Sequence, residues 1–264
     1  MGRLATRDLT IRFGGHVAVN AVSCTFHPGT LTAIVGPNGA GKTTYFDLIS
    51  GRLPASRGSV MLDGQDLSTL SASARTHAGL GRAFQLTNLF PGLTVLENVR
   101  LAVQSVQSGA HRHGLDLWRI WSDHTTLTSR ARDVLDTVWL ANRADSRVAD
   151  LSHGDQRKLE VAMLIALEPK VFMFDEPTAG LGADEMPAIL DLIRQLRQDK
   201  TKTILLVEHK MEVVRELADR IIVLHNGALV ADGTPAEVMA SPVVRQAYLG
   251  IATPVSDAAS GAAA

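Results

Sequence analysis

Residues 36–44 read Gly36-Pro37-Asn38-Gly39-Ala40-Gly41-Lys42-Thr43-Thr44, and this stretch decides the fold class. It matches the phosphate-binding pattern G-x-x-x-x-G-K-[ST] in full. An apolar run typical of a strand, residues 31–35, precedes it, and a helix-like stretch over residues 44–49 follows it. The glycines leave room for the backbone to curl around phosphate oxygens, while the amides and the positive end of the helix point at the anion. The stretch therefore predicts an α/β fold that binds ATP or GTP.

The polar groups of this loop have expected partners in a bound nucleotide. Lys42 would reach the β- and γ-phosphates, and the Thr43 hydroxyl would ligate Mg²⁺. A glycine-rich turn with a surface lysine is the plainer alternative, but the strand before the loop and the helix after it argue against that alternative. The residues that we expect to bind the nucleotide through this loop are Gly36, Pro37, Asn38, Gly39, Ala40, Gly41, Lys42, Thr43 and Thr44.

Composition and charge narrow the class of protein. The chain of 264 residues has a formal net charge of −1, from 26 basic and 27 acidic residues, which does not suggest a broad nucleic-acid surface. The single cysteine, Cys24, excludes an internal disulfide framework and suits a reducing compartment. No apolar run approaches the roughly 20 residues that span a bilayer. We therefore expect a cytoplasmic protein that contacts a membrane only through a partner.

The hydrophobic pattern changes along the chain. The first sixty or so residues are short strand-like runs broken by turn residues, and from about residue 89 to residue 167 the pattern becomes helical. We expect the tail, residues 251–264, to be disordered because it is rich in Ala, Ser and Gly. The absence of an internal repeat in the sequence excludes two fused copies of an ATPase module.

Two later runs, residues 171–174 and 203–207, are apolar throughout. Such runs are typical of strands buried on both faces of a parallel sheet. A long helix is expected between them, at about residues 186–198. Farther on, short apolar runs flank Asn226-Gly227, which is typical of a type I′ turn, so residues 221–230 are expected to form a hairpin.

The first of these apolar strands ends in two carboxylates, Asp175 and Glu176. Ligands of open parallel sheets gather at the carboxyl ends of the strands. We expect Asp175 to hold Mg²⁺, directly or through water, and Glu176 to act as the general base on the attacking water. A strand that happens to end in an acidic turn is the alternative, and the phosphate loop upstream argues against it.

Two further side chains are expected to reach the γ-phosphate. His209 follows the strand over residues 203–207, where its imidazole can bridge the γ-phosphate and the water-activating carboxylate. Gln85 ends another short apolar segment, where its neutral amide can touch both Mg²⁺ and the water without adding charge. Either residue taken alone would be unremarkable, and their places at strand ends make them candidates for catalysis.

Taken together, these residues resemble the ATP-binding subunit of an ABC transporter over about residues 4–250. The deciding element is Leu151-Ser152-His153-Gly154-Asp155-Gln156, which is similar to the signature loop of that family. The resemblance implies a P-loop ABC-type nucleotide-binding domain over residues 1–250, with a RecA-like core, an N-terminal antiparallel β-subdomain and a helical subdomain. The helical subdomain is expected at about residues 88–165, with an insertion at about residues 104–130.

In that family the signature loop closes over the nucleotide held by a second copy. Ser152 and the Gly154 amide would donate hydrogen bonds to its γ-phosphate, so that two chains sandwich two ATP molecules head to tail. His153 and Asp155 depart from the usual L-S-G-G-Q. His153 is either an adapted contact or a tolerated side chain that points away, and Asp155 is expected to cap its helix.

Two other positions bear on the comparison with the family. Gly182 stands where the family normally carries an aspartate that crosses the dimer interface, so communication between the two sites is expected to rely more on backbone contacts. Phe13 occupies the place of the aromatic side chain that stacks on adenine. The alternative for Phe13 is a strand residue in the core.

The sequence also bears on which kind of ABC protein this is. Heptad repeats for long coiled coils are absent, only one ATPase module is present, and one cysteine cannot supply a zinc cluster. The closest resemblance is to the subunits of importers of branched-chain and other hydrophobic amino acids. Importers of urea and short amides, lipopolysaccharide export and a soluble non-transport ATPase remain as alternatives. The importer resemblance is carried by residues 12–19, 81–85, 93–99 and 247–250.

The resemblance implies a set of partners at the cytoplasmic face of the inner membrane. They are a second ATPase subunit, identical or related, two integral membrane permease subunits, and an extracytoplasmic substrate-binding protein; nucleic acid is not among them. Trp118 and Trp121 lie in the expected insertion at helical i, i+3 spacing. They would either contact the membrane subunit or the bilayer, or pack the inserted helix on its own domain.

Overall fold

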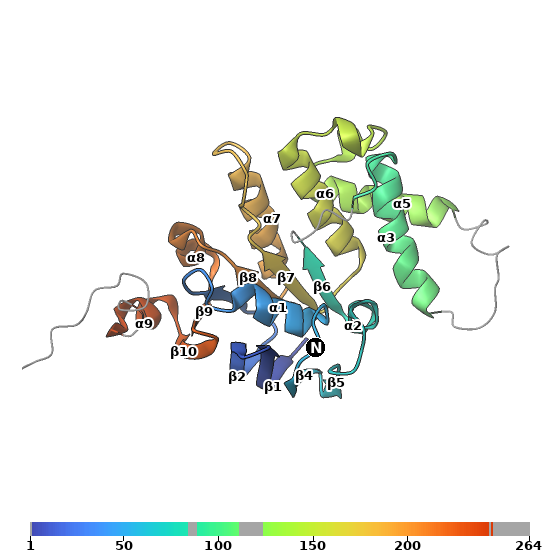
Figure 1. Ribbon diagram of the computed structural model, residues 1–264. Helices are drawn as coiled ribbons and strands as arrows, with labels where there is room; N and C mark the ends of the chain where they lie inside the picture. The colour runs from blue at the N-terminus through green and yellow to red at the C-terminus, as the bar shows by residue number, and fades with distance from the viewer. Residues whose placement is uncertain (1, 84–88, 111–123, 243, 245–264) are drawn as a thin grey trace, which may run out of the picture.

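Two β-sheets organise the part of the chain that the computed structural model describes, which is residues 2–83, 89–110, 124–242 and 244 (Figure 1). The smaller sheet is antiparallel, with the strand order β2-β1-β4-β5. The larger sheet has the order β10-β9-β3-β8-β7-β6 and is parallel except for the pairing of β9 with β10. The strands are β1 (Leu4–Phe13), β2 (His16–Phe26), β3 (Leu31–Val35), β4 (Arg57–Leu62), β5 (Gln65–Asp66), β6 (Leu80–Ala83), β7 (Val171–Asp175), β8 (Thr203–Val207), β9 (Arg220–His225) and β10 (Ala228–Gly233).

The centre of the larger sheet is apolar on both faces. Every residue of β3, β7 and β8 is buried, which confirms the prediction made from their continuous apolar runs. Successive side chains of a strand point to opposite faces, so Ala33 and Val35 join one core cluster and Ile34 joins the other. Full burial of a Val or Ile side chain contributes about 1.5–3 kcal/mol, so this sheet is the rigid support of the molecule.

Helix α1 (Lys42–Ser50) packs in the core that the two sheets share. Its residues Phe46 and Ile49 are fully buried there, together with Leu4 of β1 and Ile34 of β3. The helix ends at Gly51, which has a left-handed φ of 80° and donates its amide to the carbonyl oxygen of Asp47. Because α1 follows β3 after a short loop, residues 36–41, its N-terminus faces the edge where the parallel strands end. Helix α2 (Ala72–Ala78) lies beside it.

Three helices form a separate layer, which Figure 1 shows at the top and right: α3 (Val95–Ala110), α5 (His124–Thr137) and α6 (His153–Ala166). They pack against one another, and α6 also reaches β6. Short 3₁₀ turns, η1 (Ala141–Arg143) and η2 (Val148–Asp150), lead from α5 to α6. The helical character expected from about residue 89 is confirmed for these described residues, while the exact subdomain boundaries stay a prediction.

The remaining helices follow the strands of the larger sheet. They are α7 (Met186–Gln198), α8 (Met211–Leu217) and α9 (Pro235–Ala240), and the prediction of a helix at residues 186–198 is confirmed. The predicted hairpin is also confirmed: Asn226 and Gly227 have φ values of 49° and 76°, as a type I′ turn requires. None of the helices in the described part of the chain is both long and apolar enough to cross a membrane. Trp118, Trp121 and the tail lie outside the described residues.

Candidate nucleotide site

The phosphate loop joins the end of β3 to the start of α1. Gly41 has a φ of 96°, and a Cβ there would lie 2.4 Å from the carbonyl oxygen of Ala18 on β2, so only glycine fits. Gly39 has a φ of 79°, but no other group lies within 4 Å of where its Cβ would be. The loop is therefore tight on the side of β2 and open at Gly39. This open side, next to the N-terminus of a helix, is suited to an anion such as a triphosphate.

Lys42 folds back over the loop. Its ammonium donates hydrogen bonds to the carbonyl oxygens of Gly36, at 2.8 Å, and Pro37, at 3.0 Å, so it is already held above the loop. Burial lowers the pKa of Lys42 below its ordinary value, and the carboxylates of Glu176 and Asp175 act in the opposite direction. Lys42 is therefore close enough to Glu176 and Asp175 to interact with their charges.

Asp175 is the last residue of β7 and its carboxylate is bound by an arginine. Arg82 on β6 donates from Nη2 to Oδ2 of Asp175 at 2.6 Å and from Nη1 to Oδ1 of Asp47 at 2.7 Å. The same Nη1 reaches the hydroxyl of Ser50 at 2.9 Å. Burial raises the pKa of Asp175, and the Arg82 charge opposes that rise. Arg82 therefore ties β6, β7 and α1 together beneath the phosphate loop.

Glu176 and His209 meet directly. Oε1 of Glu176 lies 2.6 Å from Nε2 of His209, so residues from the ends of two neighbouring parallel strands form a hydrogen-bonded pair. Both side chains are partly open to solvent, at 39% and 41% exposed. Glu176 has a φ of 54°, a left-handed conformation that costs a residue with a side chain about 1–3 kcal/mol. Such strain is found at functional sites, where it aims a side chain away from the path of the strand.

The donor groups of the site are suited to Mg²⁺. The Thr43 hydroxyl, on an exposed residue at the start of α1, and the Asp175 carboxylate are hard oxygen ligands of the kind Mg²⁺ prefers. Among the described residues no group of three or more His, Cys, Asp or Glu side chains is placed to hold a metal. That sparse donor set fits a cation that keeps several waters and shares substrate phosphates. Gln85 lies outside the described residues.

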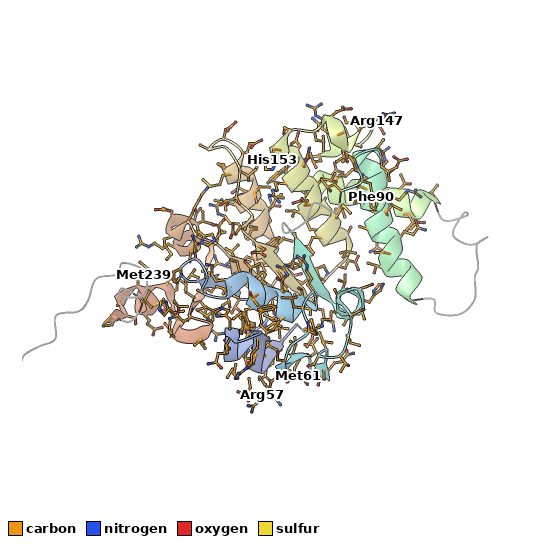
Figure 2. All side chains as sticks on the ribbon, in the orientation of Figure 1. Arg57, Met61, Phe90, Arg147, His153 and Met239 are labelled. Atoms are coloured by element: carbon orange, nitrogen blue, oxygen red, sulfur yellow. The ribbon has the colours of Figure 1, made fainter. Side chains whose placement is uncertain are left out.

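The loop that resembles the signature sequence forms the beginning of α6. Ser152 is the N-cap and its hydroxyl oxygen accepts the Asp155 amide at 3.1 Å, so the prediction that Asp155 caps the helix is wrong. Asp155 lies in the first turn, where a carboxylate suits the helix dipole, and binds Lys158 at 2.8 Å. His153 is exposed at the start of α6, near the loop that leads into α7 (Figure 2). The Gly154 amide is already engaged, donating to Oε1 of Glu185 at 2.9 Å.

Phe13 is at the tip of the hairpin between β1 and β2, paired with His16. Its side chain is 50% exposed, so the alternative of a core strand residue is wrong. The neighbouring strand β2 approaches the phosphate loop at Ala18. An exposed aromatic ring at this end of the smaller sheet is free to stack on a planar ligand.

Comparison with known proteins identifies the family. A sequence profile described as ABC transporter matches residues 19–179, which is more than half of the chain. The chain belongs to the ABC transporter ATP-binding family. A second profile, described as branched-chain amino acid ATP-binding cassette transporter, matches residues 228–252. As a member of this family of ATPases the chain binds and hydrolyses ATP, which decides between ATP and GTP.

The similarity of this ABC ATPase to curated relatives extends over nearly its whole length. It is 36% identical over 248 residues to a high-affinity branched-chain amino acid transport ATP-binding protein, LivG, of Escherichia coli K12, covering 94% of this chain and 97% of the relative. It is 35% identical to BraF of Pseudomonas aeruginosa, which has the same description, covering 94% and 97%. A probable LivG of Archaeoglobus fulgidus is 30% identical, covering 94% and 95%.

Solved structures agree on the fold. An ADP-bound ATP-binding cassette of an ABC transporter, MJ1267, superposes with a TM-score of 0.79 at 28% identity, covering 95% of this chain and all of that one. A nucleotide-free cassette superposes with a TM-score of 0.79 at 27% identity, covering 94% and 99%. The cassette MJ0796, described as a dimer in a post-hydrolysis state with ADP and Pi, superposes with a TM-score of 0.73 at 26% identity, covering 88% and 98%. The expected fold class is thereby confirmed.

The sequence predicts a nucleotide site at the carboxyl ends of the parallel strands, but it does not reveal two side chains of this ABC ATPase that hold the predicted residues in place. These are Arg82, which binds Asp175, and Glu208, whose carboxylate accepts the amides of Thr178 and His209; the sequence alone assigns no role to either. A signal was present for both, since a charged residue within or directly after a short apolar strand needs a buried partner. The identity of that partner depends on strand register, which the sequence does not reveal.

Proposed function

We propose that this ABC ATPase powers a membrane importer of branched-chain or other hydrophobic amino acids. The observation that carries the proposal is the 36% identity, over 94% of this chain and 97% of the relative, to a protein described as a branched-chain amino acid transport ATP-binding protein. The match of residues 228–252 to the branched-chain amino acid profile supports it independently. Cargo does not touch an ATPase subunit, so only these family-level similarities speak to the choice of cargo.

For the chemistry, we assign ATP to the phosphate loop and the adenine to Phe13. Lys42 would leave its two loop carbonyls for the β- and γ-phosphates, a small movement for a side chain already above the loop. Glu176 would act as the general base on water and His209 would orient that carboxylate and contact the γ-phosphate. The contact of 2.6 Å between them supports this division of roles.

Mg²⁺ would be held by the Thr43 hydroxyl, Asp175 and the amide of Gln85, all of them oxygen donors. When bound, the ion neutralises charge on the β- and γ-phosphates. The Arg82 ion pair at 2.6 Å keeps Asp175 in one orientation at the end of β7. Arg82 would therefore orient Asp175 as a ligand of Mg²⁺.

For the assembly, we propose a head-to-tail dimer in which the loop Ser152–Asp155 faces the nucleotide of the partner. The Ser152 hydroxyl and the Gly154 amide would each donate a hydrogen bond to the γ-phosphate. The MJ0796 cassette, whose dimeric structure carries ADP and Pi, has a similar fold with a TM-score of 0.73. The dimer would dock on two integral permease subunits at the cytoplasmic face of the inner membrane, with a substrate-binding protein on the other side.

Capture of the complex tests this function. A Glu176→Gln chain with an affinity tag, expressed in place of the wild type, is extracted from its own membranes with ATP and Mg²⁺ and its partners are identified. We expect two polytopic membrane proteins, with or without a second ATPase. Recovery of ribosomes, DNA or no membrane protein would refute the transport function. Permeases of an exporter or of an amide importer would refute the proposed cargo and leave the transport function intact.

A further inference from the structure

Glu208 is a buried carboxylate directly after β8. It is 3% exposed, and both of its oxygens accept hydrogen bonds. Oε1 accepts the amide of Thr178 at 3.2 Å and also its hydroxyl, and Oε2 accepts the amides of His209, at 2.9 Å, and Lys210, at 3.2 Å. A buried charge is stable only when it is hydrogen-bonded in this way, and such bonds to a charged acceptor are short and directional. Glu208 is therefore fixed in one position.

The groups bound to Glu208 belong to the two loops that carry the proposed catalytic pair. Thr178 comes two residues after Glu176, and His209 comes directly after Glu208. A backbone hydrogen bond of 2.9 Å from the Glu176 amide to the Val207 carbonyl joins the same two loops one step closer to the sheet. The loops are thus connected beneath the site by a buried carboxylate and at its surface by the contact between Glu176 and His209.

The surface contact cannot hold this geometry by itself. Its two side chains are 39% and 41% exposed, and a pair that open to solvent gains little from its mutual attraction. The strained φ of 54° at Glu176 must also be held by its surroundings. The carboxylate of Glu208 is only 3% exposed and its two bonds to Thr178 are buried, so Glu208 is the stronger link between the loops.

We propose that Glu208 is a positioning residue for ATP hydrolysis, which sets the separation of Glu176 and His209 by clamping Thr178 to the backbone of the His209 loop. The proposal rests on the catalytic roles assigned to Glu176 and His209 above. It reaches further, because it makes the rate depend on a side chain that touches neither nucleotide nor water. A displacement of about 1 Å in a reacting group can lower the rate about a hundredfold. A small shift of either loop would therefore be enough to slow hydrolysis.

Three substitutions separate this role from a general contribution to folding. Glu208→Gln keeps the shape of the side chain but replaces one carboxylate oxygen by an amide NH₂ group. That group cannot accept the hydrogen bonds of the amide or hydroxyl donors that face it. Thr178→Val keeps the volume of residue 178 and leaves Glu208 unchanged, but it removes the hydroxyl that donates to Glu208. Thr178→Ser retains a hydroxyl at this position. The matched control is Glu212→Gln, which makes the same change of charge on an exposed residue of α8 four positions later.

The measurement is steady-state ATPase activity of the purified full-length chain with Mg²⁺, together with the Kd of a fluorescent ATP analogue. For Glu208→Gln and Thr178→Val we expect kcat to fall about ten- to a hundredfold, with KM and the Kd within about twofold of wild type. Thr178→Ser and Glu212→Gln should retain most of kcat. If Glu208→Gln does not fold, Thr178→Val and Thr178→Ser decide the question on their own.

Two results would overturn the proposal. One is a kcat for Thr178→Val within about twofold of wild type, and the other is a rise in KM or in the Kd with kcat unchanged. Failure of the underlying function is distinguishable, because wild type and Glu176→Gln would then hydrolyse ATP equally well. That comparison is made in the same assay.

Discussion

Glu176 is the residue on which the chemistry of this site depends. Its left-handed φ of 54° turns it out of the line of β7, and its carboxylate meets His209 at 2.6 Å. A strand residue that continued the normal path would point into the buried sheet. The strain and the contact together explain how a glutamate follows a fully buried strand and still faces solvent.

The first prediction concerns this carboxylate. Glu176→Gln keeps the size of the side chain but removes a general base, which typically contributes about 10²–10⁴-fold to rate. We expect hydrolysis to fall by that factor while ATP binding persists, measured as phosphate release and as nucleotide retention on the purified chain. The control is Asp184→Asn, the same kind of change at an exposed residue eight positions later in the chain. Undiminished phosphate release by Glu176→Gln would rule out the assigned base.

The second prediction concerns Arg82, which is 10% exposed and pairs with Asp175 and Asp47. Arg82→Met leaves two carboxylates without their cation, and breaking a buried pair in this way costs about 3–5 kcal/mol. We expect the free energy of unfolding, from urea titration at pH 7.5, to fall by that amount. Arg82→Lys should lose less, because the charge remains. A loss for Arg82→Met below about 1 kcal/mol would contradict the account.

The same variant has an expected pH dependence. Burial already raises the pKa of Asp175 above its ordinary value, and loss of Arg82 removes an influence that lowers it. The folded variant then binds more protons than the unfolded chain, so its stability increases as the pH falls toward the ordinary range of a carboxyl. The difference in the free energy of unfolding between wild type and Arg82→Met, measured by urea titration, should therefore be smaller at pH 5 than at pH 7.5.

At the scale of elements, the central strands β3, β7 and β8, helix α7 and the hairpin of β9 and β10 lie where short-range patterns predict them, and the links between them were not predicted. The apolar runs and the Asn226-Gly227 turn could be assigned from the sequence because each depends on neighbours in the chain. The ion pair between Arg82 and Asp175 joins residues 93 positions apart, and it follows only from the register of β6 and β7. The cap of α6 was misassigned because Ser152 and Asp155 are both good capping residues, and only the position of the first turn separates them.

A third prediction uses Cys24, which lies on β2 in the core beside α1. It is 6% exposed, and burial raises its pKa to about 11. Because the thiolate is the reactive form, the native chain at pH 8 should react with a thiol reagent far more slowly than the chain unfolded in guanidinium chloride. The unfolded chain should take up one equivalent, since it has a single cysteine. Equal rates in both states would show that β2 and α1 are not packed as described.

A fourth prediction concerns Glu185, whose oxygens accept the amides of Gly154, at 2.9 Å, and Gly182, at 3.3 Å. In the proposed dimer the Gly154 amide donates to a γ-phosphate, so the carboxylate has to leave before ATP can bind across the interface. Glu185→Ala, made in the Glu176→Gln chain, should therefore strengthen ATP-dependent dimerisation by roughly tenfold, measured by analytical ultracentrifugation. Asp184→Ala is the matched control, and weaker dimerisation of Glu185→Ala would contradict the prediction.

At the scale of the whole molecule, the chain is an ABC ATPase cassette whose two sheets share the core around α1. The family could be recognised from the phosphate loop and the loop at Ser152–Asp155 because both are continuous in sequence. The cargo has no such signature in the site, since nothing in the phosphate loop or at the ends of β7 and β8 would differ between an importer of leucine and one of urea. The choice of amino acids rests on similarity over the full length and on residues 228–252.

Transport by the reconstituted complex is the most direct test of the central claim. The complex captured from membranes is placed in lipid vesicles that enclose ATP and Mg²⁺ on the side of the ATPase, and radiolabelled leucine with the binding protein is supplied on the other side. We predict leucine uptake with the wild-type chain, and none with Glu176→Gln although its complex assembles equally well. Uptake that proceeds with Glu176→Gln, or no uptake of leucine, isoleucine or valine by an ATP-hydrolysing wild-type complex, would contradict the account.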